Sequence, residues 1–444
     1  MAITKAQIKK IIKDENVQFF RLQFVDIFGF MKNVAIPKSQ IEKALDGKMM
    51  FDGSSIDGFA RINESDMYLK PDYDTFTVLP WREKEGRAAA RIICDIYLPD
   101  GTPFVGCPRG NLKRVMAEAQ KIGYTMNVGT EAEFFLFNKD EYGNPTTKTH
   151  DNAGYFSVDA DDEGIDCRRE IIETLEQMGF EIEASHHEVA EGQHEINFKY
   201  ADAITAADNT TTFKWVVKTI AKKYGLHATF MPKPVFGING SGMHTNQSLF
   251  TTKGKNAFED KKDKMGLSKT AYQYIAGIIK NARGFAAVTN PLVNSYKRLV
   301  PGYEAPVYVA WSGPNRSAML RIPAARGLST RVEVRNPDPT CNPYLAFAMM
   351  MNSGLDGIKN KLTPPSSVDC DIYGMGDIDM KKAKIASMPA SLQEAIEELK
   401  KNPIAKETLG DHILERYIAA KEKEWDSYRV SVTDWEVKNY LNVY

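Results

Sequence analysis

The chain has 444 residues, of which 43% are hydrophobic and 26% are charged, as is usual for globular proteins. A chain of this length exceeds one ordinary hydrophobic core, so we expect two domains or one large elaborated domain. Lysine and arginine number 57 and aspartate and glutamate 58, a balance that argues against a protein that coats nucleic acid.

Neither the cysteines nor the apolar segments indicate secretion or insertion into a membrane. The five cysteines are dispersed without a CxxC pair, which is typical of reduced thiols in the cytosol. The opening segment MAITKAQIKKIIKDE lacks the apolar stretch of a signal peptide, and no apolar run approaches 18 residues. We therefore predict a cytoplasmic protein with no membrane contact and no direct binding of nucleic acid.

The first hundred residues predict a small β-rich domain. Thr4 and Gln7 form a capping-box pattern, which predicts a short helix over the isoleucines that follow. FRLQF (20–24) alternates and continues through DIFG into MKNVAIP (31–37), which predicts a hairpin. Residues 73–98 contain further strand-like segments. The Pro- and Gly-rich segment 98–111 predicts a boundary between domains at 1–102 and 103–444.

The second predicted domain has an α+β pattern. Helical patterns at 111–124, 167–180 and 213–225 alternate with strand-like runs. The tail from residue 391 is charged and predicts further helices. No internal repeat is present.

Four strand-like segments each place polar side chains on one face. In TEAEFFLF (130–137), Glu131 and Glu133 share a face, and RVEVR (331–335), MHTNQSLF (243–250) and QHEINFK (193–199) alternate in the same way. One such segment usually marks a solvated strand edge, because uncompensated buried charge is costly. Four of them predict a polar-lined cavity on a sheet.

The segment EASHHEVAEGQHEI (183–196) contains three histidines and four glutamates, which indicates a metal site. The zinc pattern HExxH would need histidine at position 191, where the chain has Glu191, and Gly192 disfavours a helix there. Several glutamates with one histidine suit Mg²⁺ or Mn²⁺, and several carboxylates at one site need more than one cation. We therefore favour a two-metal phosphoryl-transfer site over zinc hydrolysis. His186, His187 and His194 are predicted to pack and hydrogen-bond around it.

Arginines and a glycine-rich loop indicate an anionic substrate. Five arginines lie within forty residues, and their guanidinium groups suit carboxylates and phosphates, although some must form structural salt bridges. They are Arg298, Arg316, Arg321, Arg331 and Arg335. The loop FGINGSGMH (236–244) could offer backbone N–H groups to an anion, but no Walker A sequence is present, so any ATP is held without a P-loop.

Seven motifs, which follow one another in the same order, resemble those of the type I bacterial glutamine synthetases. They are MFDGSSIDGF, EAEFFLF, HHEVAEGQHE, KPVFGINGSGMH, NSYKRLVPGYEAP, NRSAMLRIP and RVEVRNPDPTCNPYLAFA. The match runs from about residue 20 to the C-terminus. The resemblance implies an α+β fold with a small N-terminal β-grasp domain and a large catalytic domain with a curved antiparallel sheet and flanking helices. It also implies ATP-dependent condensation of glutamate with ammonia through γ-glutamyl phosphate. The implied assembly is a dodecamer of two hexameric rings, with active sites between subunits.

Carried over by motif, the resemblance implies a role for each of the following residues. Two or more Mg²⁺ ions, with Mn²⁺ as the alternative, would be held by Glu133, Glu188 and Glu195 and by Glu131, His244 and Glu333. Glutamate would contact Asn239, Gly240, Arg298, Glu304 and Arg335. ATP would contact Glu183, the backbone near Tyr200, Ser248, Arg316 and Arg321. The ammonium pocket would comprise Asp52, Ser55, Tyr155, Glu188 and Glu304, and the catalytic residues would be Asp52, Glu304 and Arg316.

The chain resembles the short, Gram-positive-type class, which is controlled by glutamine feedback rather than by adenylylation. Arg61 in FARINESD matches the arginine linked to that feedback, and the class also implies a nitrogen-responsive transcription regulator as a partner. Two alternatives remain: a γ-glutamyl-amine ligase of the same fold and a non-catalytic nitrogen sensor. Asp52 and Glu304 argue against the first, because a tight anionic pocket suits NH₄⁺ better than a long amine. The presence of all six metal-ligand candidates argues against the second.

Overall fold

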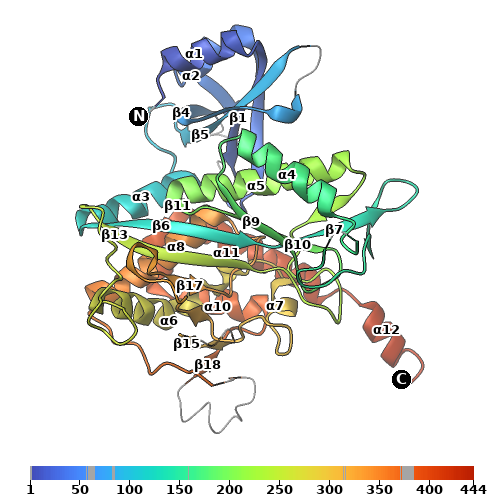
Figure 1. The fold of residues 1–444 in the computed structure, drawn as a ribbon, viewed down its shortest axis with the longest axis vertical. Helices are drawn as coiled ribbons and strands as arrows, with labels where there is room; N and C mark the ends of the chain where they lie inside the picture. The colour runs from blue at the N-terminus through green and yellow to red at the C-terminus, as the bar shows by residue number, and fades with distance from the viewer. Residues whose placement is uncertain are drawn as a thin grey trace.

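An N-terminal sheet lies at one end of the molecule, and the much larger remainder of the chain folds beside it (Figure 1). The computed structural model describes residues 3–56, 58, 66–82, 86–158, 160–313, 315, 317–370, 372 and 385–444. Helices and strands are mixed in both parts, as the α+β prediction requires. Within these described residues, no helix combines the length and apolarity needed to span a membrane.

The N-terminal part is a five-stranded sheet in the order β2-β1-β5-β4-β3, with its helices packed on it. Its elements are α1 (Lys5–Asp14), β1 (Val17–Val25), β2 (Met31–Pro37), α2 (Ile41–Leu45), β3 (Met49–Asp52), β4 (Asp66–Val78) and β5 (Ala88–Tyr97). The predicted capping box of Thr4 and Gln7 begins α1, and β1 and β2 form the predicted antiparallel hairpin. Phe20, Leu22 and Phe24 alternate into a core that they share with Ile8 of α1.

The larger part contains two large adjoining sheets and a separate pair, β14 with β18, and its described strand pairs are antiparallel except for β15 with β16. One sheet runs β11-β6-β13-β17-β16-β15 and the other β12-β7-β10-β9, with β8 beside β7. Its strands are β6 (Tyr124–Ala132), β7 (Phe134–Lys139), β8 (Pro145–Thr149), β9 (Ile182–His187), β10 (Gln193–Phe198), β11 (Ala201–Asp202), β12 (His227–Thr229), β13 (Met243–Thr251), β14 (Tyr308–Val309), β15 (Trp311–Ser312), β16 (Leu320–Arg321), β17 (Val332–Val334) and β18 (Ala386–Ser387).

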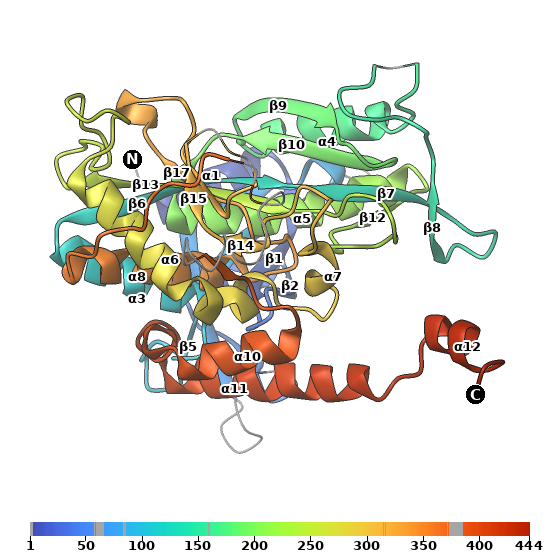
Figure 2. The same ribbon diagram turned by 90° about the horizontal axis from the view of Figure 1, so that it is seen from below.

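Helices cover these sheets and enclose the main hydrophobic core (Figures 1 and 2). They are α3 (Pro108–Lys121), α4 (Ile165–Gln177), α5 (Ala203–Lys223), α6 (Lys269–Thr289), α7 (Ser295–Arg298), α8 (Pro343–Lys359), α10 (Leu392–Lys401), α11 (Pro403–Arg429) and α12 (Asp434–Tyr440). Helix α8 is buried along nearly its whole length. The helices predicted at 111–124, 167–180 and 213–225 are confirmed as α3, α4 and α5. The helical tail is also confirmed, with a break at Gly410, whose φ is 70°.

A buried arginine joins the N-terminal sheet to the larger part. Arg109 of α3 is 3% exposed, and its guanidinium donates to Asp72 at 2.7 Å and to Asp95 at 2.9 Å, both in the N-terminal sheet. The same group donates to Asp208 of α5 at 2.8 Å, and the hydroxyl of Tyr344 in α8 donates to Asp208 at 2.6 Å. One cation therefore holds three carboxylates from both parts of the chain.

Candidate active site

The predicted strand 130–137 is interrupted at Glu133, and this break separates the two sheets. The backbone N–H of Glu133 donates to the Gly242 carbonyl at 3.1 Å, one position beyond the Ala132–Met243 pair of β6 and β13. Its carboxylate accepts from Gly242 N and from Gln193 Nε2, both at 2.9 Å. A continuous strand was therefore wrong, but the predicted alternation of faces holds. Phe134 and Leu136 pack in the main core, and Phe135 and Phe137 pack in a separate small cluster.

One group of metal-ligand candidates is assembled from three neighbouring strands. Glu131 of β6, His244 of β13 and Glu333 of β17 offer ligand atoms that all lie within 4.8 Å of one another. The register places His244 opposite Glu131 and Asn246 opposite Glu333. The valines that flank Glu333 are buried in the main core, as the alternation in RVEVR predicts.

A second group lies on the β9–β10 hairpin. His186, Glu188 and Glu195 offer ligand atoms within the same 4.8 Å, and His186 Nε2 lies 2.8 Å from Glu188 Oε1. His186 was not predicted as a ligand. The hairpin register places it directly opposite Glu195. The feature of the sequence that could have predicted this pairing is the turn at Glu191–Gly192. Gly192 has a φ of 69°, which lets the segment fold back on itself.

The carboxylates of this hairpin group repel one another in the absence of cations. Burial, together with the charge of Glu188, raises the pKa of Glu133 to about 8. Burial and the charges of Glu133, Glu131 and Glu188 raise the pKa of Glu195 well above its usual range. Burial alone would also raise the pKa of Glu131, but hydrogen bonds from His244 and Asn246 hold it at about 2. Clustered, buried carboxylates of this kind fit hard divalent cations such as Mg²⁺ or Mn²⁺.

This repulsion predicts an unusual pH dependence of the folding stability when a chelator has removed divalent ions from the protein. The pKa of Glu133 is raised above its usual 4.5, so the folded state binds more protons than the unfolded state between about pH 4.5 and 8. Stability from this group therefore falls as the pH rises through that window. We expect calorimetry in chelator to show this fall in Tm, and saturating Mg²⁺ to remove most of it. Equally steep curves with and without Mg²⁺ would contradict this.

Arginines converge on the same carboxylates. Arg321 Nη1 donates to Glu333 Oε2 at 2.9 Å, and Arg335 Nη1 donates to Glu333 Oε1 at 2.5 Å. Within the described residues, the buried Nε atoms of Arg321 and Arg335 have no hydrogen-bond partner. Buried donors of this kind normally have an acceptor, so they fit an anionic ligand. Buried Arg298 donates to the Asn336 carbonyl at 2.8 Å.

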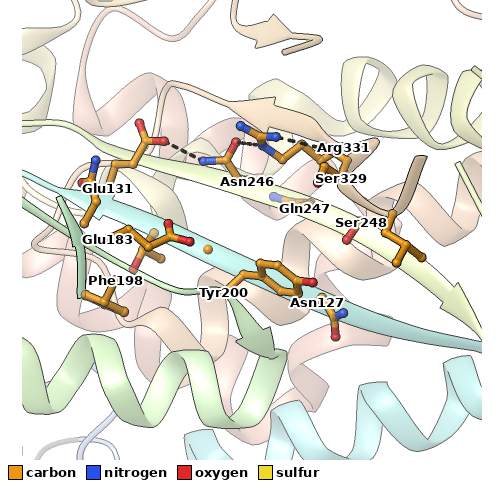
Figure 3. A pocket seen from close by; sticks show the side chains of 14 residues that line it. Asn127, Glu131, Glu183, Phe198, Tyr200, Asn246, Gln247, Ser248, Ser329 and Arg331 are labelled. Atoms are coloured by element: carbon orange, nitrogen blue, oxygen red, sulfur yellow. Dashed lines mark hydrogen bonds between the residues drawn. The ribbon is translucent and has the colours of Figure 1, made fainter. Parts of the chain in front are cut away.

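A polar cavity of about 220 Å³ lies beside the Glu131 group and has room for part of a nucleotide. Glu183, Tyr200 and Ser248, which the resemblance assigns to ATP contact, line this cavity (Figure 3). Asn246 connects the cavity to the metal-ligand group. Its Nδ2 donates to Glu131 Oε1 at 2.8 Å, and its Oδ1 accepts from Arg331 Nε at 2.9 Å (Figure 3).

The predicted ammonium-pocket residues come from separate elements of the chain. Asp52 ends β3 in the N-terminal sheet and is exposed, and its carboxylate accepts from Ser54 N at 2.8 Å; Ser55 is also exposed. Tyr155 is half exposed beside His186, with 5.6 Å between ring centroids. Glu304 is exposed on a loop and accepts from Asn239 Nδ2 at 3.4 Å. Arg61 and Arg316 lie outside the described residues.

A third cluster of histidine, aspartate and arginine side chains lies near the hairpin, and its members bond to one another. Arg168 Nη1 donates to Asp162 at 2.6 Å and to His194 Nδ1 at 2.9 Å. The proton of neutral His194 must then lie on Nε2, which leaves no lone pair there for a metal. Asp151 lies 3.2 Å from His187 Nε2 and accepts from Gly192 N at 2.8 Å. As predicted, His187 and His194 pack and hydrogen-bond around the site.

Comparison with known families identifies this arrangement. The family model of the glutamine synthetase beta-grasp domain matches residues 16–99, and that of the glutamine synthetase catalytic domain matches residues 105–440. The chain belongs to the glutamine synthetase family. The predicted family and its fold, a β-grasp domain followed by a large catalytic domain, are thereby confirmed, and so is the prediction of a ligase.

Individual glutamine synthetases are similar over essentially their whole length. That of Clostridium saccharobutylicum is 61% identical over 441 residues, and that of Staphylococcus aureus (strain MRSA252) is 58% identical over 443 residues. Each comparison covers 99% of both chains. Among solved structures, the GmaS/ADP complex has a TM-score of 0.88 at 32% identity, covering 98% of this chain and 99% of its own. The cryo-EM structure of Plasmodium falciparum glutamine synthetase has a TM-score of 0.87 at 27% identity, covering 99% of both chains.

Proposed function

We propose that this protein joins glutamate and ammonium into glutamine, with ATP as the co-substrate, through γ-glutamyl phosphate. The observation that carries this proposal is a pair of carboxylate–histidine groups, one of which lines the cavity through Glu131 and meets Arg321 and Arg335 through Glu333. Glutamine synthetases that are 58–61% identical over the full length support the same reaction.

The two groups are proposed to hold Mg²⁺, with Mn²⁺ as the alternative. Glu131, His244 and Glu333 would form one site, and Glu188 and Glu195 the other, with Glu133 beside them and His186 as an added candidate ligand. When bound, such cations neutralise the charge of phosphate oxygens during phosphoryl transfer. The carboxylates of the hairpin group would then ionise, because a nearby cation offsets their mutual repulsion.

The remaining residues are proposed to position the substrates. Glu183, Tyr200 and Ser248 would contact the nucleotide from the cavity, and Arg321 and Arg316 its phosphates. The glutamate would lie against Arg298, Arg335 and the loop with Asn239 and Gly240. A side chain does not fit at Gly240, since a Cβ there would lie 2.1 Å from the Pro232 carbonyl oxygen. Glu304 would cover the acyl phosphate and exclude water.

The ammonium pocket is proposed to form only between copies of the chain. Asp52 and Ser55 of one copy would meet Tyr155, Glu188 and Glu304 of its neighbour, because Asp52 and Ser55 are exposed on the N-terminal sheet. A group of carboxylates attracts NH₄⁺ and can accept its proton, which releases the nucleophile NH₃. We propose a dodecamer of two hexameric rings as the assembly, domains at 1–102 and 103–444, and the cytoplasm as the location.

An amine-dependence assay with the purified protein, ATP, Mg²⁺ and glutamate tests this function. We expect phosphate release and glutamine formation that require ammonium. Phosphate release that requires putrescine or another amine, but not ammonium, would show a γ-glutamyl-amine ligase. No turnover with any amine would show a non-catalytic sensor.

Feedback inhibition by glutamine is proposed to depend on Arg61. We expect Arg61→Ala to relieve inhibition by glutamine at least about tenfold, because loss of one charge-assisted hydrogen bond to a ligand costs about 1.5–3 kcal/mol. Activity without glutamine should change little. Inhibition curves for the wild type and Arg61→Ala check this, and superimposed curves would remove Arg61 from the regulatory site. A nitrogen-responsive transcription regulator is proposed as a partner of the same feedback-inhibited enzyme.

A further inference from the structure

Two loops carry residues of the proposed glutamate site. Asn239 and Gly240 lie in the segment 230–242, and Tyr303 and Glu304 lie in the segment 299–307; neither segment contains a helix or strand. Glu304 has a φ of 58°, a left-handed conformation that is uncommon for residues other than glycine. A backbone hydrogen bond of 2.8 Å from Ser241 N to the Pro232 carbonyl closes the base of the first loop, and side-chain contacts add to what positions both loops.

Lys233 contacts both of these loops. It is 8% exposed, and its ammonium donates to the carbonyl of Ile238 in the first loop. The same nitrogen lies 3.7 Å from the centroid of the Tyr303 ring in the second loop. The Lys233 backbone is also anchored to Asn294 by two hydrogen bonds, of 2.8 and 3.0 Å. Asn294 precedes α7, which carries Arg298.

The surroundings of this ammonium make the ring contact important. Among the described residues, Lys233 forms no ion pair with a carboxylate, although buried lysines usually have one. Burial and the nearby charge of Arg298 lower the pKa of Lys233. The Ile238 carbonyl and the face of the Tyr303 ring are therefore the groups that stabilise the cation, and desolvated cation–π contacts are the stronger ones.

We propose that Lys233 is a positioning residue that links the Asn239–Gly240 loop to the Tyr303–Glu304 loop, so that both sides of the glutamate site are held together. This inference rests on the proposed function, because the role of Glu304 does. The Asn239–Glu304 hydrogen bond of 3.4 Å also joins the loops, but it is too long to hold them firmly. The Lys233–Tyr303 contact, 3.7 Å from the ammonium to the ring centroid, supplies a second link.

Loosening this link should expose the acyl phosphate to water. Water attack would form a bond from its oxygen to the carbonyl carbon and break the bond to phosphate. The products are glutamate, inorganic phosphate and a proton, so ATP is consumed without glutamine. The ratio of ADP released to glutamine formed therefore reports on the link, whereas a general loss of active protein leaves the ratio unchanged.

The test compares Lys233→Met with Lys218→Met. Lys218 is the matched control, because its ammonium also lies over a ring, 5.9 Å from the centroid of Phe230, but Lys218 is on helix α5 and this ring contact does not join the two loops. We expect Lys233→Met to raise the KM for glutamate about tenfold, as loss of a desolvated cation–π contact implies. It should also raise the ADP-to-glutamine ratio, while Lys218→Met matches the wild type. Tyr303→Leu should behave as Lys233→Met does, and Tyr303→Phe, which keeps the ring, as the wild type does.

Amide hydrogen exchange without substrates provides a readout independent of activity. We expect faster exchange in residues 234–240 and 300–306 for both Lys233→Met and Tyr303→Leu. Wild-type exchange in these segments, with an unchanged ADP-to-glutamine ratio, would overturn the proposal. A wild-type protein that forms no glutamine would instead overturn the proposed function, and the exchange measurement would still test the link.

Discussion

Replacing Glu195 by glutamine is expected to lower glutamine formation at least about 100-fold while leaving the fold intact. Changes to groups that only support a metal ligand cost about 10- to 100-fold, so loss of a charged ligand should cost more. The fold should tolerate the change because burial and three neighbouring carboxylates raise the pKa of Glu195, which favours its neutral acid form without cations. Glutamine has the shape of that neutral acid.

Calorimetry and metal titration separate this effect from misfolding. In chelator, Glu195→Gln should have a Tm at or above that of the wild type, whereas the rise in Tm on adding Mn²⁺ should be largely lost. Glu191→Gln is the matched control, since Glu191 is an exposed residue in the turn of the same hairpin. Glu195→Gln with full activity and a normal response to Mn²⁺ would remove Glu195 from the metal site.

Replacing Arg109 by methionine is expected to destabilise the protein by about 3–5 kcal/mol, because breaking a buried ion pair leaves charge uncompensated. Arg109 is 3% exposed and holds Asp72, Asp95 and Asp208, so three carboxylates would lose their shared cation. Two of these belong to the N-terminal sheet. The change should therefore also loosen that sheet from the rest of the molecule.

Lys113→Met provides the comparison for Arg109→Met. The Lys113 ammonium contacts Asp95 at 2.5 Å and Asp72 at 3.5 Å, but its side chain is 38% exposed. Water screens such a pair, so its loss should cost about 1 kcal/mol or less. Denaturant or thermal unfolding of the two variants measures the difference. An Arg109→Met variant as stable as Lys113→Met would contradict a shared buried cation.

The alternation of side chains along single strands could be predicted from the sequence. The valines flanking Glu333 are buried and Glu333 meets arginines, as the pattern in RVEVR indicates. The argument against a helical zinc site also holds, because Gly192 lies in the turn of a hairpin. These features follow from period two and from the backbone preferences of individual residues, which are local properties.

Pairings between distant segments could not be predicted in this way. The alternation in TEAEFFLF indicates the face on which Glu133 lies, but not that its carboxylate accepts from Gly242 N and Gln193 Nε2 between β6 and β7. His186 becomes a ligand candidate only because the hairpin register sets it opposite Glu195. Lys233 begins the motif KPVFGINGSGMH, but residue spacing does not indicate its contacts with Ile238, Asn294 and Tyr303, which arise from loops.

The sequence by itself determined the family, the two-part α+β fold and the residue types of the candidate site. This was possible because long motifs and strand periodicity are properties of the linear sequence. Only the tertiary structure decided which carboxylates share a group, that one arginine binds both parts, and that one lysine joins two loops. Such contacts depend on strand register and on loops meeting in space, and neither is encoded in the spacing of residues along a single segment.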